Sequence, residues 1–311
     1  MTSPVNAAVL CATLTGLSVP HFLASAIAQA AQLTQEHLCI VLRADFFDSG
    51  HHISHSGSWD DVQQLLTFVY VQATKVAQEM GKILMKIDVL LKSLNDDLQQ
   101  TLTSEMDVVF RVEGDSFPLP PSVASIRQET LTSTANHDPP ADTDLASQAS
   151  NPSLFPVVAL GGTFDHLHAG HKILLSMAAW IASEKIIRID SVRQFLSIFK
   201  PGLIYDIVPI NDVYGPTGWD PNIQALVVSK ETASGATSIA NYRATHSLPV
   251  LQLFTIDVIS STSTNLSGED AEILKQAKMS STYIREWIVA TGLRSRPLSN
   301  FKHLSRPFHI L

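Results

Sequence analysis

Short apolar runs and amphipathic stretches alternate along most of this chain of 311 residues. In the N-terminal part, the apolar runs predict strands, and stretches with an apolar residue every three or four positions predict helices. Residues 83–91 stay ambiguous between strand and helix. The other expected elements are strands at 9–14, 38–42 and 107–112 and helices at 20–33 and 62–80. This alternation indicates a small α/β unit.

The C-terminal part shows the same alternation. A four-residue apolar run at 157–160 is typical of a buried parallel strand, and Gly161 and Gly162 end it. Further strands are expected at 204–208, 225–229 and 249–254, and helices at 171–183, 191–199, 234–245 and 280–290. The predicted fold class is therefore α/β, with a Rossmann-like C-terminal parallel sheet that carries helices on both faces and a smaller N-terminal α/β domain.

The segment between these parts, residues 118–153, differs in composition. It is rich in Pro, Ser, Thr and Asp and poor in large apolar side chains. Such a segment buries too little apolar surface to offset the entropy lost on ordering, which predicts a disordered linker. The expected domains are thus an N-terminal α/β domain at 1–117, of unknown role, and a C-terminal domain at 154–311.

Composition and charge narrow the class of protein. Hydrophobic residues make up 45% of the chain, and the formal net charge is −8, which argues against a partner with a nucleic-acid backbone. Cys11 and Cys39 cannot build a disulfide framework, so two buried thiols in a reducing compartment are expected. No Lys or Arg precedes Arg43, and every apolar run is shorter than the ~20 residues of a membrane span. The sequence therefore predicts a cytoplasmic protein without membrane contact.

The first candidate site is the stretch GGTFDHLHAGH at 161–171, between a predicted strand and a predicted helix. In parallel sheets, ligands bind at the carboxyl ends of strands, where helix N-termini expose N–H groups. His168 and His171 can place both rings on one side of the first turn and, with the positive helix end, neutralise charge on a transferring phosphoryl group. A metal site at His166, His168 and His171 is the weaker alternative, and no metal site is predicted. Glycines that allow a phosphate to approach the backbone are Gly161, Gly162 and Gly170.

The second candidate site lies where the last predicted helix begins. Consecutive hydroxyl residues there form an N-cap and add donors to the free N–H groups, which suits the β- and γ-phosphates of a nucleotide. Arg285, one turn into the helix, can reach the same phosphates with its planar fork of donors. The hydroxyl residues are Ser280, Ser281 and Thr282.

The third candidate site is the stretch VVSKET at 227–232, where a predicted strand ends in a polar turn before a helix. It again lies at the expected ligand-binding edge of the sheet. Gly235, Asn241 and Arg243 follow it. The polar side chains of the turn are Ser229, Glu231 and Thr232.

Together these stretches resemble a known family. GGTFDHLHAGH matches the signature of the nucleotidylyltransferase superfamily, whose HxGH element is here 168–171, and residues 280–285 match its SSTxxR element. Two further stretches resemble the eukaryotic and archaeal phosphopantetheine adenylyltransferases. They are DIVPINDVYGPT at 206–217, and VSKET with the Asn241 and Arg243 that follow it. Asn241 and Arg243 stand one residue closer together than in the family. The long N-terminal extension resembles that of fungal members. The sequence contains no GxxxxGK[ST] string, so a fused P-loop kinase is not expected.

The resemblance implies that the protein transfers the adenylyl group of ATP to 4′-phosphopantetheine, giving dephospho-CoA and pyrophosphate in coenzyme A biosynthesis. It implies His168, His171 and Arg285 as catalytic residues, and Mg²⁺ held mainly through ATP phosphates. Other enzymes of the coenzyme A pathway are expected as further partners. The ATP- and substrate-binding residues that it implies are Gly161, Gly162, Thr163, Phe164, Gly170, Ser229, Glu231, Thr232, Ser280, Ser281 and Thr282.

One segment departs from the family pattern. After the first helix, residues 184–188 run almost directly into 189–195, where family members carry a second strand and a loop with basic residues. A parallel crossover needs a dozen or more residues, so a sheet without one of its strands is an open expectation. If a strand were missing, the protein could instead be a degenerate nucleotide-binding scaffold subunit of a complex that makes coenzyme A, which is one alternative function. Another is a different nucleotidyltransferase, such as a cytidylyltransferase.

Overall fold

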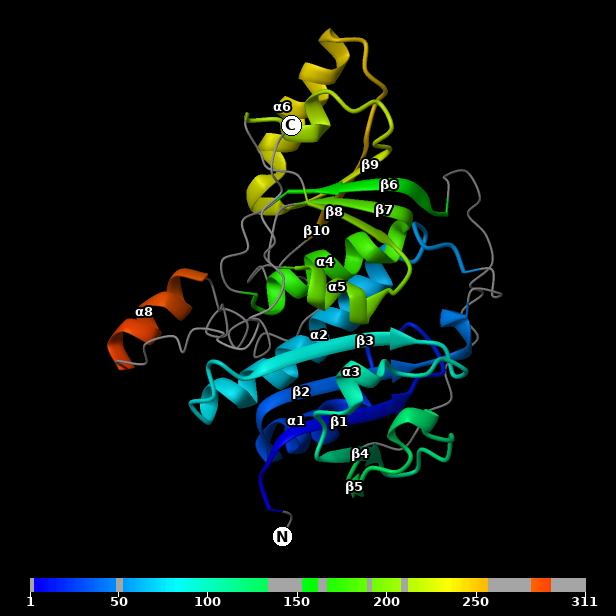
Figure 1. Ribbon diagram of the computed structural model, residues 1–311, viewed down its shortest axis with the longest axis vertical. Coiled ribbons are helices and arrows are strands. Elements are labelled where there is room, and N and C mark those ends of the chain that lie inside the picture. The colour runs from blue at the N-terminus through cyan, green and yellow to red at the C-terminus, as the bar shows by residue number, and fades with distance from the viewer. Residues whose placement is uncertain are drawn as a thin grey trace, which may run out of the picture.

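The computed structural model describes residues 3–48, 53–133, 153–161, 167–188, 192–207, 212–256 and 281–291. These residues form two five-stranded parallel sheets with helices against them (Figure 1). The prediction of an α/β fold is confirmed. We name residues 3–133 the N-terminal lobe and residues 153–291 the C-terminal lobe.

The sheet of the N-terminal lobe has the strand order β3-β2-β1-β4-β5, and every pairing in it is parallel. Its central strand β1 is almost completely buried, because a parallel sheet is covered on both faces and favours continuous apolar runs. The strands are β1 (Val5–Thr13), β2 (Thr34–Arg43), β3 (Lys86–Lys92), β4 (Val108–Val112) and β5 (Gln128–Leu131). The helices are α1 (Ala24–Leu33), α2 (Trp59–Glu79) and α3 (Gln100–Thr103), with 3-10 turns η1 (His21–Leu23), η2 (Asp45–Phe47) and η3 (Pro121–Val123).

Strand β5 lies inside the range 118–153 that composition predicts as a linker. It pairs with β4, and the backbone N–H groups of Val109 and Glu113 donate to the carbonyls of Arg127 and Leu131. An edge strand is held by such ladder bonds and leaves one side open to solvent, so it tolerates polar residues. The start of the predicted linker is therefore wrong, because residues up to 133 belong to the N-terminal lobe. Residues 134–152 lie outside the described part of the chain.

The sheet of the C-terminal lobe has the order β10-β9-β6-β7-β8, again with parallel pairings throughout. Figure 1 shows α4 and α5 on the face of this sheet that is turned toward α2, and it shows α6 on the opposite face. The strands are β6 (Phe155–Leu160), β7 (Ala182–Arg188), β8 (Ile204–Ile207), β9 (Ala225–Ser229) and β10 (Gln252–Ile256). The helices are α4 (Ala169–Ile181), α5 (Arg193–Phe199), α6 (Ala233–Thr245) and α8 (Ser281–Thr291), with 3-10 turns η4 (Gly215–Gly218) and η5 (Lys230–Thr232).

The expectation of a missing strand is wrong, because the second sheet has a strand at this place. Strand β7 takes the place next to β6 and also pairs with β8, so the described sheet is continuous. Helix α4 ends at Ile181, two residues earlier than the sequence pattern suggests, which frees Ala182 and Ser183 for the strand. The crossover from β7 to β8 then uses residues 189–203, which is long enough for a parallel connection.

The apolar residues of the second sheet alternate between two hydrophobic clusters. On β9, Ala225 and Val227 join the larger cluster, whereas Leu226 and Val228 join a smaller one beside α6. This is the period of two that a strand with two covered faces requires. The larger cluster continues through α4 and α2 into the first sheet, so the two lobes share one core.

Both cysteines are buried in the first sheet without a disulfide, as the sequence predicts. Burial raises the pKa of the Cys11 thiol to about 12. No helix in the described part of the chain is long and apolar enough to cross a membrane.

Candidate active site

The candidate site begins where β6 and β9 end side by side. In the order β10-β9-β6-β7-β8, chain connections reverse direction between these two strands, which is where doubly wound sheets bind ligands. The N–H of Gly161 donates to the carbonyl of Val227 at 3.2 Å, so Gly161 continues the ladder to the sheet edge. Among the described residues, a side chain at Gly161 would meet only Val228, at 3.9 Å.

The HxGH element forms the first turn of α4. His168 is the N-cap residue, with an extended backbone (φ −109°, ψ 175°), and its carbonyl accepts the first helical bond from Lys172 N–H at 3.0 Å. The N–H groups of Ala169 and Gly170 therefore have no acceptor within the helix. With the positive end of the helix dipole, they form a site suited to an anion.

The imidazole rings of His168 and His171 stack on each other. Their centroids lie 3.8 Å apart, with 25° between the planes. Burial, followed by the nearby charges of His171 and Lys172, lowers the pKa of His168 from 6.5 to about 3. His168 is therefore neutral near pH 7, and its buried Nδ1 has no hydrogen-bond partner among the described residues. A neutral ring with an unused nitrogen is equipped to bond a ligand oxygen.

A cavity of about 300 Å³ opens beside this turn and joins elements from both lobes. Ile284 of α8 lines it together with His168, and the Ile284 side chain is only 5% exposed. The helix of the predicted SSTxxR element thus reaches the same cavity as the HxGH element. The other lining residues are Tyr70, Thr74, Ile83, Leu84, Met85, Lys86, Ile87, Asp88, Leu167, Ala169, Lys172, Gln194 and Phe195.

Several predicted site residues cannot be placed. For Ser281, Thr282 and Arg285 the structure gives the helical backbone of α8 only. Those that lie outside the described residues are Gly162, Thr163, Phe164 and Ser280.

The sequence is similar to those of known proteins. A phosphopantetheine adenylyltransferase of Pyrobaculum aerophilum is 33% identical over 126 residues, which are 34% of this chain and 81% of that protein. This chain belongs to the phosphopantetheine adenylyltransferase family. The family member of Saccharomyces cerevisiae is 37% identical over 161 residues, 44% of this chain and 50% of that protein.

An uncharacterized protein of Schizosaccharomyces pombe is 34% identical over 163 residues, 45% of this chain and 50% of that protein. The chain therefore spans about half the length of these two yeast relatives. No family model matches the chain.

The family-like VSKET turn holds itself together at the end of β9. Ser229 and Thr232 form a reciprocal capping box at the start of η5, with Ser229 N–H donating to Thr232 Oγ1 at 3.2 Å. Glu231 is exposed on the same turn. The hydroxyls of Ser229 and Thr232 thus shape the turn at the carboxyl end of β9, at the sheet edge beside Gly161.

Arg243, which follows Asn241 after the family-like VSKET turn, is a structural residue. It is 1% exposed and donates to the carbonyls of Pro249 (2.7 Å), Thr217 (2.6 Å) and Asp220 (3.1 Å). These bonds connect the end of α6 to η4, to the loop after it and to the segment that enters β10. A buried guanidinium satisfies several carbonyls at once because its donors are fixed in one plane.

Replacing Arg243 with alanine is expected to lower the free energy of unfolding by about 2–3 kcal/mol, because part-buried carbonyls lose their donors. Arg243→Lys keeps the charge and some of the bonds, so a smaller loss is expected. Urea unfolding followed by circular dichroism measures both variants. An alanine variant as stable as the unmutated chain would contradict this role.

Lowering the pH from 7 to 5 is expected to reduce stability, with about 1–2 kcal/mol of the loss due to His168 after allowance for its partial exposure. The unfolded chain takes up a proton on this residue below about pH 6.5, whereas the folded chain does so only near its lowered pKa of about 3. The contribution is therefore complete above pH 6.5 and decreases as the pH falls. Urea unfolding at both pH values should show a smaller difference in His168→Gln, and an equal difference would refute the assignment.

Three charged residues that line the cavity are not among the predicted site residues: Lys86 and Asp88 of β3 and Lys172 of α4. Each stands in or beside an apolar run, KIDVLLK in one lobe and HKILLSMAAWI in the other. A single charge in a buried run requires a partner, and that requirement was the available signal. The sequence alone does not show that the partners lie in different lobes.

Proposed function

We propose that this protein transfers the adenylyl group of ATP to 4′-phosphopantetheine and releases pyrophosphate, forming dephospho-CoA. The observation that carries the proposal is the HxGH turn of α4, which opens at the switch point of the sheet in a chain of this family. The cavity that His168 shares with Ile284 of α8 supports a site built from both family motifs.

In this proposal the acceptor phosphate is itself the nucleophile, so the protein supplies position and charge neutralisation. The N–H groups of Ala169 and Gly170 and the rings of His168 and His171 would bond the phosphate oxygens as charge develops on them. The neutral state of His168 makes it a hydrogen-bond donor that carries no charge of its own. Ser281, Thr282 and Arg285 would hold the outer phosphates at the start of α8.

Mg²⁺ fits the proposal only as a partner of the triphosphate. Asp88 is the single carboxylate among the described residues that line the cavity, and it is already paired with Lys172 and Lys86. Mg²⁺ prefers oxygen ligands and keeps much of its water, so ATP phosphates would supply its anionic ligands. The ion would offset charge on the leaving pyrophosphate.

We also propose a cytoplasmic location, supported by two buried, unpaired thiols of the kind kept in reducing compartments. Other enzymes of the coenzyme A pathway are the proposed protein partners. Co-purification of the tagged chain from its own host, followed by mass spectrometry, would test both points.

The test uses the purified full chain with ATP, 4′-phosphopantetheine and Mg²⁺, with pyrophosphate and dephospho-CoA measured together. Release is expected to require both substrates. Pantetheine without its phosphate is the matched control acceptor and should give no release, because it lacks the attacking oxygen. ATP binding without pyrophosphate release would favour a degenerate scaffold, and release with cytidine triphosphate in place of ATP would favour a cytidylyltransferase.

A further inference from the structure

An ion pair buried between the two lobes joins Asp88 of β3 to Lys172 of α4. The Lys172 Nζ lies 2.7 Å from the Asp88 Oδ1, and the two side chains are 6% and 0% exposed. The same Nζ donates to the carbonyl of Ile87 at 2.7 Å. Two bonds from one ammonium to adjacent residues of β3 fix the position of the Lys172 head more strictly than one bond would.

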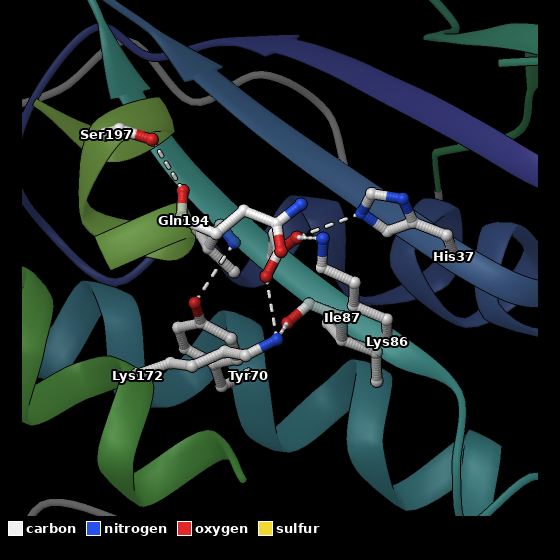
Figure 2. A network of polar contacts seen from close by, with 9 residues as sticks. His37, Tyr70, Lys86, Ile87, Lys172, Gln194 and Ser197 are labelled. Atoms are coloured by element: carbon white, nitrogen blue, oxygen red, sulfur yellow. Dashed lines mark hydrogen bonds and ion pairs between the residues drawn. The ribbon is translucent and has the colours of Figure 1, made fainter. Parts of the chain in front are cut away.

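The carboxylate of Asp88 is satisfied on every side. His37 of β2 lies 2.9 Å from its Oδ2 and Lys86 lies 3.2 Å from the same oxygen. Figure 2 shows His37, Lys86 and Lys172 converging on it from three different elements. Burial by itself would raise the pKa of Asp88, but Lys172, His37 and Lys86 hold it well below its usual range. Asp88 is therefore an anion throughout the working pH range.

Lys172 is also part of the turn that carries the proposed chemistry. It follows His171 directly, and its N–H makes the first helical bond of α4, to the carbonyl of His168. Whatever fixes the Lys172 side chain therefore fixes the turn that places both histidine rings. The rings, the Lys172 head and Asp88 all border the same cavity or lie beside it.

We infer that Asp88 is a positioning residue for the proposed adenylyl transfer: the N-terminal lobe holds Lys172, and through it sets the orientation of His168 and His171. The inference rests on the proposed function and gives the N-terminal lobe a part in the site. Asp88 acts through Lys172, and no contact with a substrate is required of it. An error of about 1 Å in such a turn is sufficient to slow a positioned reaction by up to ~100-fold.

The test compares Asp88→Asn and Lys172→Met with the matched control Lys92→Met. Lys92 is also a buried lysine between the lobes, 8% exposed, but its Nζ donates to the carbonyl of Phe199 at the end of α5. The control thus removes a contact between the lobes without touching the first turn of α4. Circular dichroism and thermal melts establish that each variant folds.

The first measurement is the set of imidazole ¹⁵N–¹H signals in ligand-free, histidine-labelled protein, with those of His168 and His171 assigned from His→Gln variants. We expect both signals to move or broaden in Asp88→Asn and Lys172→Met and to stay in place in Lys92→Met. The second measurement is steady-state transfer. We expect kcat to fall by about tenfold or more in the two test variants, with the KM for 4′-phosphopantetheine within about threefold.

Signals of His168 and His171 that coincide with those of the unmutated chain in both test variants would overturn the inference, as would equal changes in Lys92→Met. If the unmutated chain transfers no adenylyl group, the proposed function fails, and the imidazole signals alone then decide whether Asp88 positions the turn. If Asp88→Asn does not fold, Lys172→Met decides, because it leaves Asp88 paired with His37 and Lys86.

Discussion

Replacing Asp88 with alanine is expected to lower the free energy of unfolding by about 3–5 kcal/mol. Lys172 would keep its charge in a site where its side chain is 6% exposed, with no carboxylate to offset the desolvation. His37 and Lys86 would lose the same partner. Because the two lobes share one hydrophobic core, the loss should appear as a shift of a single unfolding transition.

Urea unfolding of Asp88→Ala measures this loss, with Asp206→Ala as the matched control. Asp206 pairs with Lys185 at 3.5 Å, but the two side chains are 44% and 34% exposed, so its removal should cost less than about 1 kcal/mol. The Asp88 contribution is present above the unfolded pKa of an aspartate, near pH 4, and decreases as the pH falls below it. Equal losses in the two variants would contradict the buried pair as a source of stability.

The strands of both lobes could be predicted because burial on both faces leaves a direct trace in the sequence. The run 225–229 is read correctly to the residue, since Ala225 to Val228 are all buried and Ser229 begins the polar turn. Residues 83–91 are ambiguous in the sequence because their buried part has no polar alternation. Pairing with β2 makes residues from Lys86 onward a strand, whereas residues 83–85 form the turn before it.

Two predictions were wrong for the same physical reason: the start of the linker at 118 and the missing strand after α4. In both segments, which are polar or mixed in composition, the neighbouring strands determine the conformation. Strand β5 (QETL) is stabilised by its ladder with β4 rather than by its own apolar content. Strand β7 (ASEKIIR) begins directly after α4 because Ala182 can pair with Phe155. A single sequence contains the composition of these segments but not the strands beside them.

One part of the candidate site could be predicted from the sequence and another could not. The HxGH turn is local, so its position at the end of a strand and the start of a helix follows from nearby residues. The partner of Lys172 is 84 positions away in the chain, on a strand of the other lobe. No pattern within either segment specifies that pairing, although the isolated charge in each apolar run shows that a partner is needed.

Replacing His168 or His171 with alanine is expected to lower kcat/KM for the proposed transfer by about 10²–10³-fold. Both rings lie at the N-terminus of α4, where the phosphate charge would develop, and their stacking at 3.8 Å makes them one unit. The effects should therefore be far from additive, and the double variant should be little slower than either single variant. Steady-state pyrophosphate release, with thermal melts to confirm folding, measures all three.

His246→Ala is the matched control, because this histidine also stacks on an aromatic ring one helical turn away. Its centroid lies 3.9 Å from that of Tyr242 at the end of α6, and His246 is exposed and does not line the cavity of His168. A loss of stacking alone should change kcat/KM by less than about threefold at such a site. If His168→Ala, His171→Ala and His246→Ala were all equally active while the unmutated chain transfers the adenylyl group, the helix N-terminus would act without the rings, and the assignment of both histidines would be wrong.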